Sequence, residues 1–453
     1  MHFLENIPNK ISKIKDRIAS HWLLSVGIVL TIFHLVIFVM VVLQPGRLPV
    51  RPDSGIFQYA GWYMAQGGTL YTEIWEVKLP LAYEIPALLA LLSGGNILVH
   101  HLLNVMITII AAVGSGLLVS LLVHDLTNDR GAALISGVSV LLLPGFFYLP
   151  AYGFKAKFFV TITALLSIYS ARTERPMLSG GAAAACVGFY QAAAIVPILA
   201  VVLSYQHDKV RGAARAVAGG VVLTAIMVAP IVLSGATSAM ITEAILTLFI
   251  IDTGHVSLID ALVSGGRYFG VAAPAVLLGG IGILFSISDY NWRDTWWITV
   301  AAVWFGFIVF FVDYDSYPDL IPGLVIVAIG VGIIYDKFSW KHGRAVIAGV
   351  VSICIVVNLI LVLSGGVIAG IPSIKSPQPL DDLQQRTYQK FGEDGEKAQI
   401  QRPTVQYLYW NQIESNTCHI RLSGTEIRWL HMTNKPWIDK NCGDLQTATE
   451  HIG

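Results

Sequence analysis

The residue types best suited to chemistry in this chain are a carboxylate and three lysines. Asp53 follows Arg51 and Pro52 and precedes a stretch with helical spacing. A carboxylate can act as a general base and remove a proton from an attacking hydroxyl. Asp at a helix start is also a common N-cap that accepts backbone hydrogen bonds. The sequence leaves both roles open for Asp53, and one residue could fill both.

The lysines supply the complementary charge. Lys78 lies between two short apolar stretches, and Lys155 and Lys157 lie close together after Tyr152-Gly153. A lysine ammonium is a compact positive charge suited to phosphate. A lysine at the membrane edge can also simply extend its ammonium into the headgroup layer. These positions predict either a phosphate site or interfacial lysines.

The composition indicates what kind of protein positions these groups. The chain has 453 residues, of which 55% are hydrophobic and 13% charged, whereas about a quarter of an ordinary soluble domain is charged. Its 29 basic and 29 acidic residues give a formal net charge of zero. No bulk field therefore draws it to nucleic acid. The composition predicts an all-α polytopic membrane protein.

Apolar segments long enough to cross a bilayer recur along most of the chain. We expect eleven spans, at residues 21–43, 97–123, 132–148, 158–171, 177–190, 192–205, 214–234, 269–287, 296–312, 320–335 and 345–369. The pair 177–190 and 192–205 could instead be one bent re-entrant element. The basic residues of the amphipathic segment 1–21, and of the other proposed inner segments, predict a cytoplasmic N-terminus. An odd number of spans places the C-terminus outside.

Two long outer loops, residues 44–96 and 235–268, are expected to be functional because simple connectors are shorter. In the first, helical spacing over residues 56–64 ends at Gly67-Gly68, and the apolar stretch 79–92 is too short to span. In the second, residues 239–251 form a similar stretch. We expect all three to be helices lying along the outer membrane surface.

The composition changes near residue 370, where charged residues become frequent. We expect residues 370–453 to form a small soluble outer domain, with strands predicted by the alternating stretches 405–409 and 427–429. Cys418 and Cys442 lie in this domain, and an oxidising exterior would allow them to pair. Spacing alone does not decide whether they form a disulfide.

The span interiors contain almost no ionisable residues, and the charged groups gather in the outer loops. Transporters usually carry such groups inside the bilayer, so this distribution favours chemistry at the outer interface. The sequence contains no convincing Cys/His metal spacing and no nucleotide-binding glycine loop. We expect no cofactor, with a divalent metal possible but not indicated.

Residues 22–205 resemble the GT-C superfamily of integral membrane glycosyltransferases. The resemblance rests on Pro52-Asp53, the aromatic helix ending at Gly67-Gly68, and the string Leu70-Tyr71 through Trp75-Glu76-Val77-Lys78-Leu79-Pro80. The most similar members take a sugar from a polyprenyl-phosphate monosaccharide, as do protein O-mannosyltransferases, the aminoarabinose transferase of lipid A and archaeal dolichyl-phosphate-mannose transferases. A weaker match begins at Tyr317-Pro318.

The resemblance implies roles for particular residues. Asp53 matches the catalytic base, and Lys78 matches the lysine that holds the carrier phosphate. Further residues implied in phosphate binding are Lys155, Lys157 and Arg267, and those in sugar or acceptor binding are Glu73, Glu76, Tyr59, Asp313 and Asp315. The chain lacks the acidic pair that oligosaccharyltransferases carry in the second outer loop, which argues against a bound metal.

The function implied is transfer of a monosaccharide, which we take to be mannose, from a polyprenyl- or dolichyl-phosphate carrier. The acceptor would be a hydroxyl of a glycan, lipid or protein at the outer face of the cell membrane, and the reaction would invert the anomeric centre. Two other classes stay open: a transporter or flippase for lipid-linked sugar, and a non-catalytic membrane scaffold. A transporter built from inverted repeats would show internal symmetry, and inspection finds none.

Overall fold

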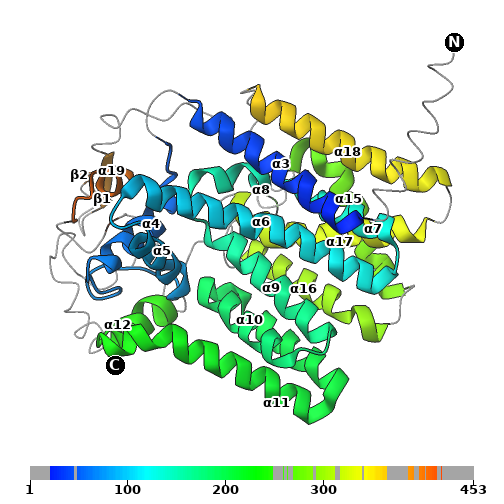
Figure 1. The fold of residues 1–453 in the computed structure, drawn as a ribbon, viewed down its shortest axis with the longest axis horizontal. Helices are drawn as coiled ribbons and strands as arrows, with labels where there is room; N and C mark the ends of the chain where they lie inside the picture. The colour runs from blue at the N-terminus through cyan, green and yellow to red at the C-terminus, as the bar shows by residue number, and fades with distance from the viewer. Residues whose placement is uncertain are drawn as a thin grey trace. The chain divides into compact units, whose positions relative to one another are not determined.

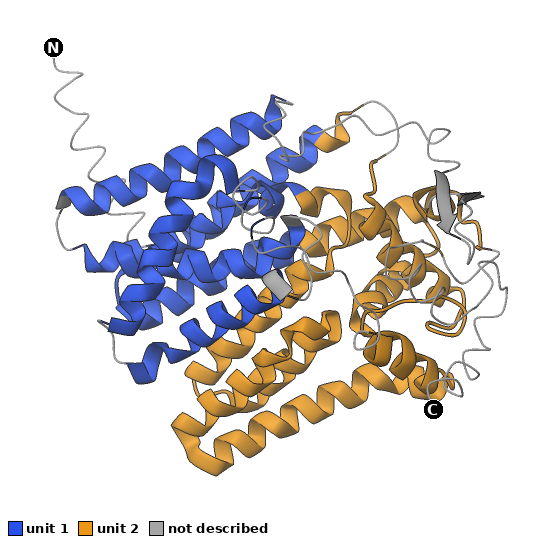
Figure 2. Ribbon diagram, turned by 180° about the vertical axis from the view of Figure 1, so that it is seen from behind, with its two compact units in different colours: residues 1–40, 109–148, 256–375 blue, residues 41–108, 149–255, 376–453 orange. Residues whose placement is uncertain are grey.

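The computed structural model describes a mainly helical chain (Figure 1). The described residues are 21–44, 48–247, 259, 263, 269–288, 292–311, 317–338, 341–364, 386–391, 397–402, 405–415 and 420. They divide into two compact units, coloured separately in Figure 2. The first draws on residues 1–40, 109–148 and 256–375, and the second on residues 41–108, 149–255 and 376–453. Each unit therefore combines segments that are distant in the sequence.

The first unit is built around helix α17. Its elements are α3 (Trp22–Val42), the later part of α6 (Ile97–Thr127), α7 (Arg130–Val138), η1 (Ser139–Leu142), α8 (Pro144–Tyr148), η5 (Gly270–Ala272), α15 (Ala273–Ser288), α16 (Trp292–Phe311), η6 (Tyr317–Leu320), α17 (Ile321–Lys337) and α18 (Lys341–Leu363). Helix α17 packs against α7, α15, α16 and α18. Gly279 and Gly330 let α15 approach α17 closely. A Cβ on Gly279 would overlap the Val327 carbonyl, and a Cβ on Gly330 would overlap the Gly279 carbonyl.

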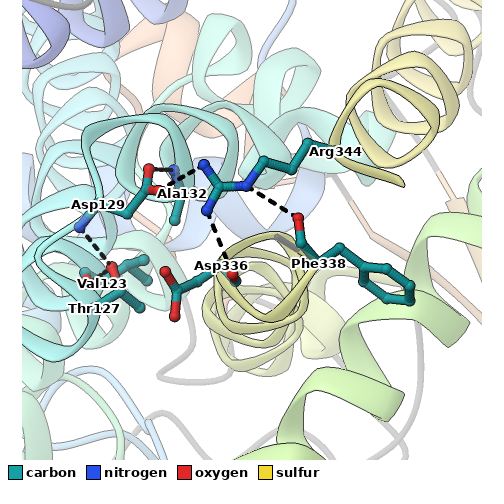
Figure 3. A network of polar contacts seen from close by, with 7 residues as sticks. All are labelled: Val123, Thr127, Asp129, Ala132, Asp336, Phe338 and Arg344. Atoms are coloured by element: carbon teal, nitrogen blue, oxygen red, sulfur yellow. Dashed lines mark hydrogen bonds and ion pairs between the residues drawn. The ribbon is translucent and has the colours of Figure 1, made fainter. Parts of the chain in front are cut away.

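An ion pair closes one end of this unit (Figure 3). The Arg344 guanidinium lies 2.9 Å from Asp129 Oδ2 and donates to the Phe338 carbonyl at 3.1 Å and to the Asp336 carbonyl at 3.4 Å. Asp129 also caps α7 by accepting from the Ala132 amide at 2.9 Å. Arg344 thus joins the start of α18 to the end of α17 and the start of α7. Its positive charge also complements the negative end of the α17 dipole.

Arg344→Ala should lower the free energy of unfolding by about 2 kcal/mol, because it removes several hydrogen bonds to one charged group. Arg215→Ala is a matched control, since its ion pair with Asp208 is 3.4 Å long and both side chains are 50% exposed. The control should cost less than about 1 kcal/mol. Denaturant unfolding in detergent measures both, and equal losses would show that the Arg344 cluster contributes no more than a surface pair.

The second unit holds the segments that contain Asp53, Lys78, Lys155 and Lys157. Its elements are the first part of α6, α4 (Pro52–Ala65), α5 (Leu81–Leu92), η2 (Leu149–Tyr152), α9 (Ala156–Arg172), α10 (Pro176–Phe189), η3 (Gln191–Ala193), α11 (Ile195–Leu233), α12 (Thr237–Met240), the π-helix η4 (Ile241–Leu246), β1 (Arg386–Phe391), β2 (Lys397–Arg402) and α19 (Val405–Asn411). Helices α9, α10 and α11 lie side by side (Figure 1). Strands β1 and β2 pair antiparallel, with Arg386 opposite Arg402.

Helix α4 is enclosed within this unit. Residues 54–62 are all buried, and α4 packs against α5 and α19. A Cβ on Gly61 would overlap Pro86, so glycine permits the close contact with α5. The surface helices predicted at 56–64 and 79–92 are confirmed as helices α4 and α5. Their orientation along the membrane surface stays a prediction.

Each of the eleven predicted spans falls on helical segments over its described residues. Among the described residues, six helices are long and apolar enough to cross a membrane: Trp22–Val42, Ile97–Thr127, Gln191–Leu233, Gly270–Ser288, Pro318–Lys337 and His342–Leu363. A seventh span results if the bent pair Arg130–Leu142 and Pro144–Tyr152 counts as one. Within α11, Asp208 and Lys209 are not helical and separate two predicted spans. The structure supports a multi-pass membrane protein, and the number eleven stays a prediction.

The strand predicted at residues 405–409 is wrong, because these residues begin helix α19. Val405, Leu408 and Tyr409 are all buried, and this spacing of three and four is helical. The described strands β1 and β2 lie earlier, at positions where none was predicted. The predicted strand at 427–429 and the amphipathic segment before residue 21 lie outside the described residues. The predicted helix at 239–251 is described to residue 247, as α12 and the π-helix η4.

Candidate active site

Asp53 lies in the first turn of α4 and pairs with Lys155. Arg51 occupies the N-cap position with extended backbone, and Pro52 begins the helix, as proline commonly does. The N-cap interpretation of Asp53 is therefore wrong. Its Oδ2 instead lies 2.5 Å from Lys155 Nζ. The Asp53 side chain is 43% exposed and that of Lys155 is 6% exposed, so a buried lysine holds a carboxylate that solvent can reach.

Lys78 and Lys157 converge on the ring of Tyr190. The Lys157 ammonium lies 3.5 Å from the ring centroid, and the Lys78 ammonium lies 5.3 Å from it. Both distances are in the range of cation–π attraction. Tyr190 follows directly after α10 and has extended backbone. Two lysines from two different segments thus lie within about 6 Å of one aromatic ring, and a region with two ammonium groups favours an anion such as phosphate.

The backbone around Lys78 is fixed from two sides. Tyr71 has φ of 70°, and its hydroxyl donates to the Lys78 carbonyl at 2.7 Å. The Gln191 amide donates to the Val77 carbonyl at 2.5 Å and to the Ala244 carbonyl at 2.8 Å. Lys78 is therefore held by the preceding loop and by the segment after Tyr190.

Glu76 and Glu243 anchor the same loop. The Glu76 amide donates to Glu243 Oε2 at 3.0 Å, and Glu243 is fully buried in the π-helix η4. Glu76 Oε2 accepts from the Tyr83 hydroxyl at 2.6 Å. Burial, together with the nearby Glu76 carboxylate, raises the pKa of Tyr83 well above its usual value. Tyr83 therefore remains a hydrogen-bond donor to Glu76.

The other predicted site residues have varied surroundings. Glu73 Oε2 accepts from the Thr69 amide at 2.5 Å. The Tyr59 hydroxyl accepts from the Ser415 amide at 2.7 Å, and burial raises the pKa of Tyr59 to about 12. Five predicted residues lie outside the described part of the chain: Arg267, Asp313, Asp315, Cys418 and Cys442.

Sequence reasoning missed Tyr190, Gln191 and Glu243. An aromatic residue at the end of an apolar helix is a signal for the membrane interface, and that signal could have drawn attention to Tyr190. Gln191 and Glu243 are polar residues in otherwise apolar stretches, which is a weaker signal. The described residues contain no group of three or more His, Cys, Asp or Glu side chains that could hold a metal ion.

Solved structures of known proteins share the fold of this chain. ArnT from Cupriavidus metallidurans bound to undecaprenyl phosphate matches with a TM-score of 0.52 and 15% identity, over 71% of this chain and 60% of that one. The Archaeoglobus fulgidus oligosaccharyltransferase in the apo form matches with a TM-score of 0.51 and 12% identity, over 80% of this chain and 58% of that one. These likenesses show the fold. The chain has the polytopic membrane fold of the GT-C glycosyltransferases.

Sequence comparison identifies the family. The family model of DolP-mannose mannosyltransferase matches residues 67–229. A dolichol phosphate-mannose mannosyltransferase of Haloferax volcanii is 30% identical in an alignment 443 residues long, which covers 93% of this chain and 96% of the relative. The chain belongs to the dolichol phosphate-mannose mannosyltransferase family and is a glycosyltransferase. The GT-C resemblance expected from the sequence is confirmed.

Glu84 of α5 gives the unit a dependence on pH. Burial raises the pKa of Glu84 to about 7, and its Oε1 has no hydrogen-bond partner among the described residues. The folded state therefore binds this proton more tightly than the unfolded state. The resulting stability is fully present below about pH 4.5 and is lost as the pH rises through 7.

Glu84→Gln should remove this loss, because the amide carries no charge at any pH. Above pH 7 the variant should be more stable than the wild type by roughly 1–2 kcal/mol, after discounting for partial exposure to solvent. Thermal unfolding in detergent across pH 4 to 8.5 measures the effect. Parallel curves for the two proteins would show that Glu84 ionises normally.

Proposed function

We propose that this protein transfers mannose from a polyprenyl- or dolichyl-phosphate carrier to an acceptor hydroxyl. The proposal rests on the contacts made by the short segment from Lys155 to Lys157. Lys155 pairs with the Asp53 carboxylate, and Lys157, two residues later, lies over the ring of Tyr190, which Lys78 also approaches. One segment thus joins a reachable carboxylate to a pair of lysines. Family membership supplies the donor class, as named for the Haloferax volcanii relative.

Asp53 is the general base of this reaction. It accepts the proton from the acceptor hydroxyl, whose oxygen attacks the anomeric carbon of the mannose. The bond from that carbon to the phosphate oxygen breaks on the opposite face, so the anomeric centre inverts. The sequence implied that Lys155 binds phosphate, but because its ammonium pairs with Asp53, we assign it here to orienting the Asp53 carboxylate. The Asp53 side chain is 43% exposed, which leaves room for an acceptor hydroxyl to approach.

Lys78 and Lys157 bind the phosphate of the bound donor, and they continue to stabilise it as negative charge grows on the departing lipid phosphate. Lys157 lies in the first turn of α9, where free backbone amides and the helix dipole also favour an anion. Fixed positive groups of this kind need no rearrangement during the reaction. The wider roles predicted for Glu73, Glu76, Tyr59, Arg267, Asp313 and Asp315 remain part of the proposal.

The reaction takes place at the extracytoplasmic face. Support comes from the distribution of basic residues, which are frequent in the proposed inner segments, whereas the loop of Lys78 lies in the long predicted outer loop. Carrier phosphates lie at headgroup depth, where the lysines are expected. The acceptor class, whether glycan, lipid or protein, is left to the assay.

Asp53→Asn should lower the turnover number by about 100-fold to 10,000-fold, the usual contribution of a general base. The assay follows radiolabelled mannose from synthetic polyprenyl-phosphate mannose into the glycan, lipid and protein fractions of a membrane extract. Asp208→Asn is the matched control, because Asp208 is also a carboxylate paired with a cation, Arg215. Full activity of Asp53→Asn would overturn the assignment of the base.

Lys78→Met and Lys157→Met should each raise the KM for the donor about 10-fold to 100-fold, as expected for loss of a charged hydrogen bond worth about 1.5–3 kcal/mol. Lys209→Met is the control, because Lys209 also lies over a tyrosine ring, 5.8 Å from the Tyr205 centroid. Initial rates at varied donor concentration give the KM values. Unchanged donor KM in both variants would remove the phosphate role.

A further inference from the structure

Gln58 connects the helix of Asp53 to the segment of Lys155. The Gln58 side chain is fully buried, and its Oε1 accepts a hydrogen bond from the Phe154 amide at 3.2 Å. Its Nε2 lies 3.2 Å from His101 Nδ1. A buried carboxamide is costly unless its polar atoms are satisfied. Gln58 meets this requirement by binding the backbone directly before Lys155.

Gly153 brings that backbone against α4. Its φ is 113°, a conformation that favours glycine. A Cβ at this position would overlap Gln58 Oε1 and would lie 3.2 Å from Ser54 Cβ. Ser54 and Gln58 are four residues apart and share one face of the helix. The Gly153 backbone therefore lies directly on this face, with no space for a side chain.

Phe154 fixes the segment on its other side. Its ring stacks on Phe159 with centroids 4.6 Å apart and meets Phe57 edge-on at 5.5 Å. The next residue, Lys155, has extended backbone, with φ of −140° and ψ of 108°. Lys155 is 4% exposed. The surrounding protein therefore fixes the position of its side chain relative to Asp53.

We infer that Gln58 is a positioning residue for the transfer reaction. Its carboxamide fixes the backbone from Gly153 to Lys155, and this places the Lys155 ammonium on the Asp53 carboxylate. Gln58 acts through Lys155 and does not touch the substrate. The inference rests on the proposed role of Asp53 as the base, and it adds a residue that neither the sequence pattern nor the family resemblance indicates.

The test variant is Gln58→Met, which keeps the length of the side chain and removes its hydrogen bonds, including the one to the Phe154 amide. Its turnover number should fall at least about tenfold, the effect of a misplaced catalytic group, while the donor KM stays within twofold. Ser54→Ala is the matched control on the same helix face, because the Ser54 hydroxyl has no partner among the described residues. The control should retain wild-type turnover.

Amine labelling gives a readout that does not depend on activity. The intact protein in detergent is treated with an acetylating reagent, and the modification of Lys155 is followed by mass spectrometry. Gln58→Met should make Lys155 react at least several times faster, because the ammonium leaves its buried position. Gly153→Ala displaces Gln58 Oε1 from the opposite side. It should also lower turnover and speed the labelling of Lys155, and it replaces Gln58→Met in the test if that variant does not fold.

A combined variant separates positioning from general damage. Turnover of Gln58→Met/Lys155→Met should equal that of Lys155→Met within twofold, because Gln58 acts through that lysine. Independent, multiplicative losses would overturn the inference, as would labelling of Lys155 that is unchanged in both Gln58→Met and Gly153→Ala. If Asp53→Asn retains activity, the proposed function fails instead, and the labelling result still decides whether Gln58 positions Lys155.

Discussion

The ion pair between Asp53 and Lys155 is the interaction on which the candidate site depends. A buried ammonium is costly unless a counter-charge lies next to it, and Asp53 provides that charge at 2.5 Å. The pair is asymmetric, since the lysine is almost inaccessible and the carboxylate is partly exposed. Burial of one partner fixes the geometry, and exposure of the other leaves it available to a substrate.

The rest of the second unit holds this pair and the neighbouring lysines in place. Helix α4 is buried along most of its length, so Asp53 projects from a rigid element. The C-terminal helix α19 contributes to this enclosure, because the Tyr409 hydroxyl lies 3.1 Å from His100 Nδ1 and Val405 contacts the position of Gly55. Support by rigid elements is what a preorganised site requires.

Sequence reasoning found most of the charged residues of the site and little of how they pair. Asp53, Lys78, Lys155 and Lys157 were predictable because charge is rare in this chain and these groups fall in the segments predicted to be outer loops. The pairing of Asp53 with Lys155 joins residues 102 positions apart, and no local pattern specifies such a contact. Tyr190 was missed because its role arises only when two lysines from other segments meet its ring.

The sequence predicted the helices at residues 56–64 and 79–92 correctly, and it predicted the five residues 405–409 wrongly as a strand. The segments that became α4 and α5 were predictable from spacing and from the glycines that follow α4. Residues 405–409 alternate over too few positions to distinguish strand from helix, and packing against α4 decided the outcome.

The proposed mechanism requires that Lys155 contribute to mannosyl transfer by holding the Asp53 carboxylate. The most direct test measures turnover of polyprenyl-phosphate mannose by Asp53→Asn, Lys155→Met and the double variant. We predict that the double variant is as slow as Asp53→Asn alone, because the lysine has no function once the carboxylate is gone. Losses that multiply in the double variant would show that the two residues act independently and would contradict this mechanism.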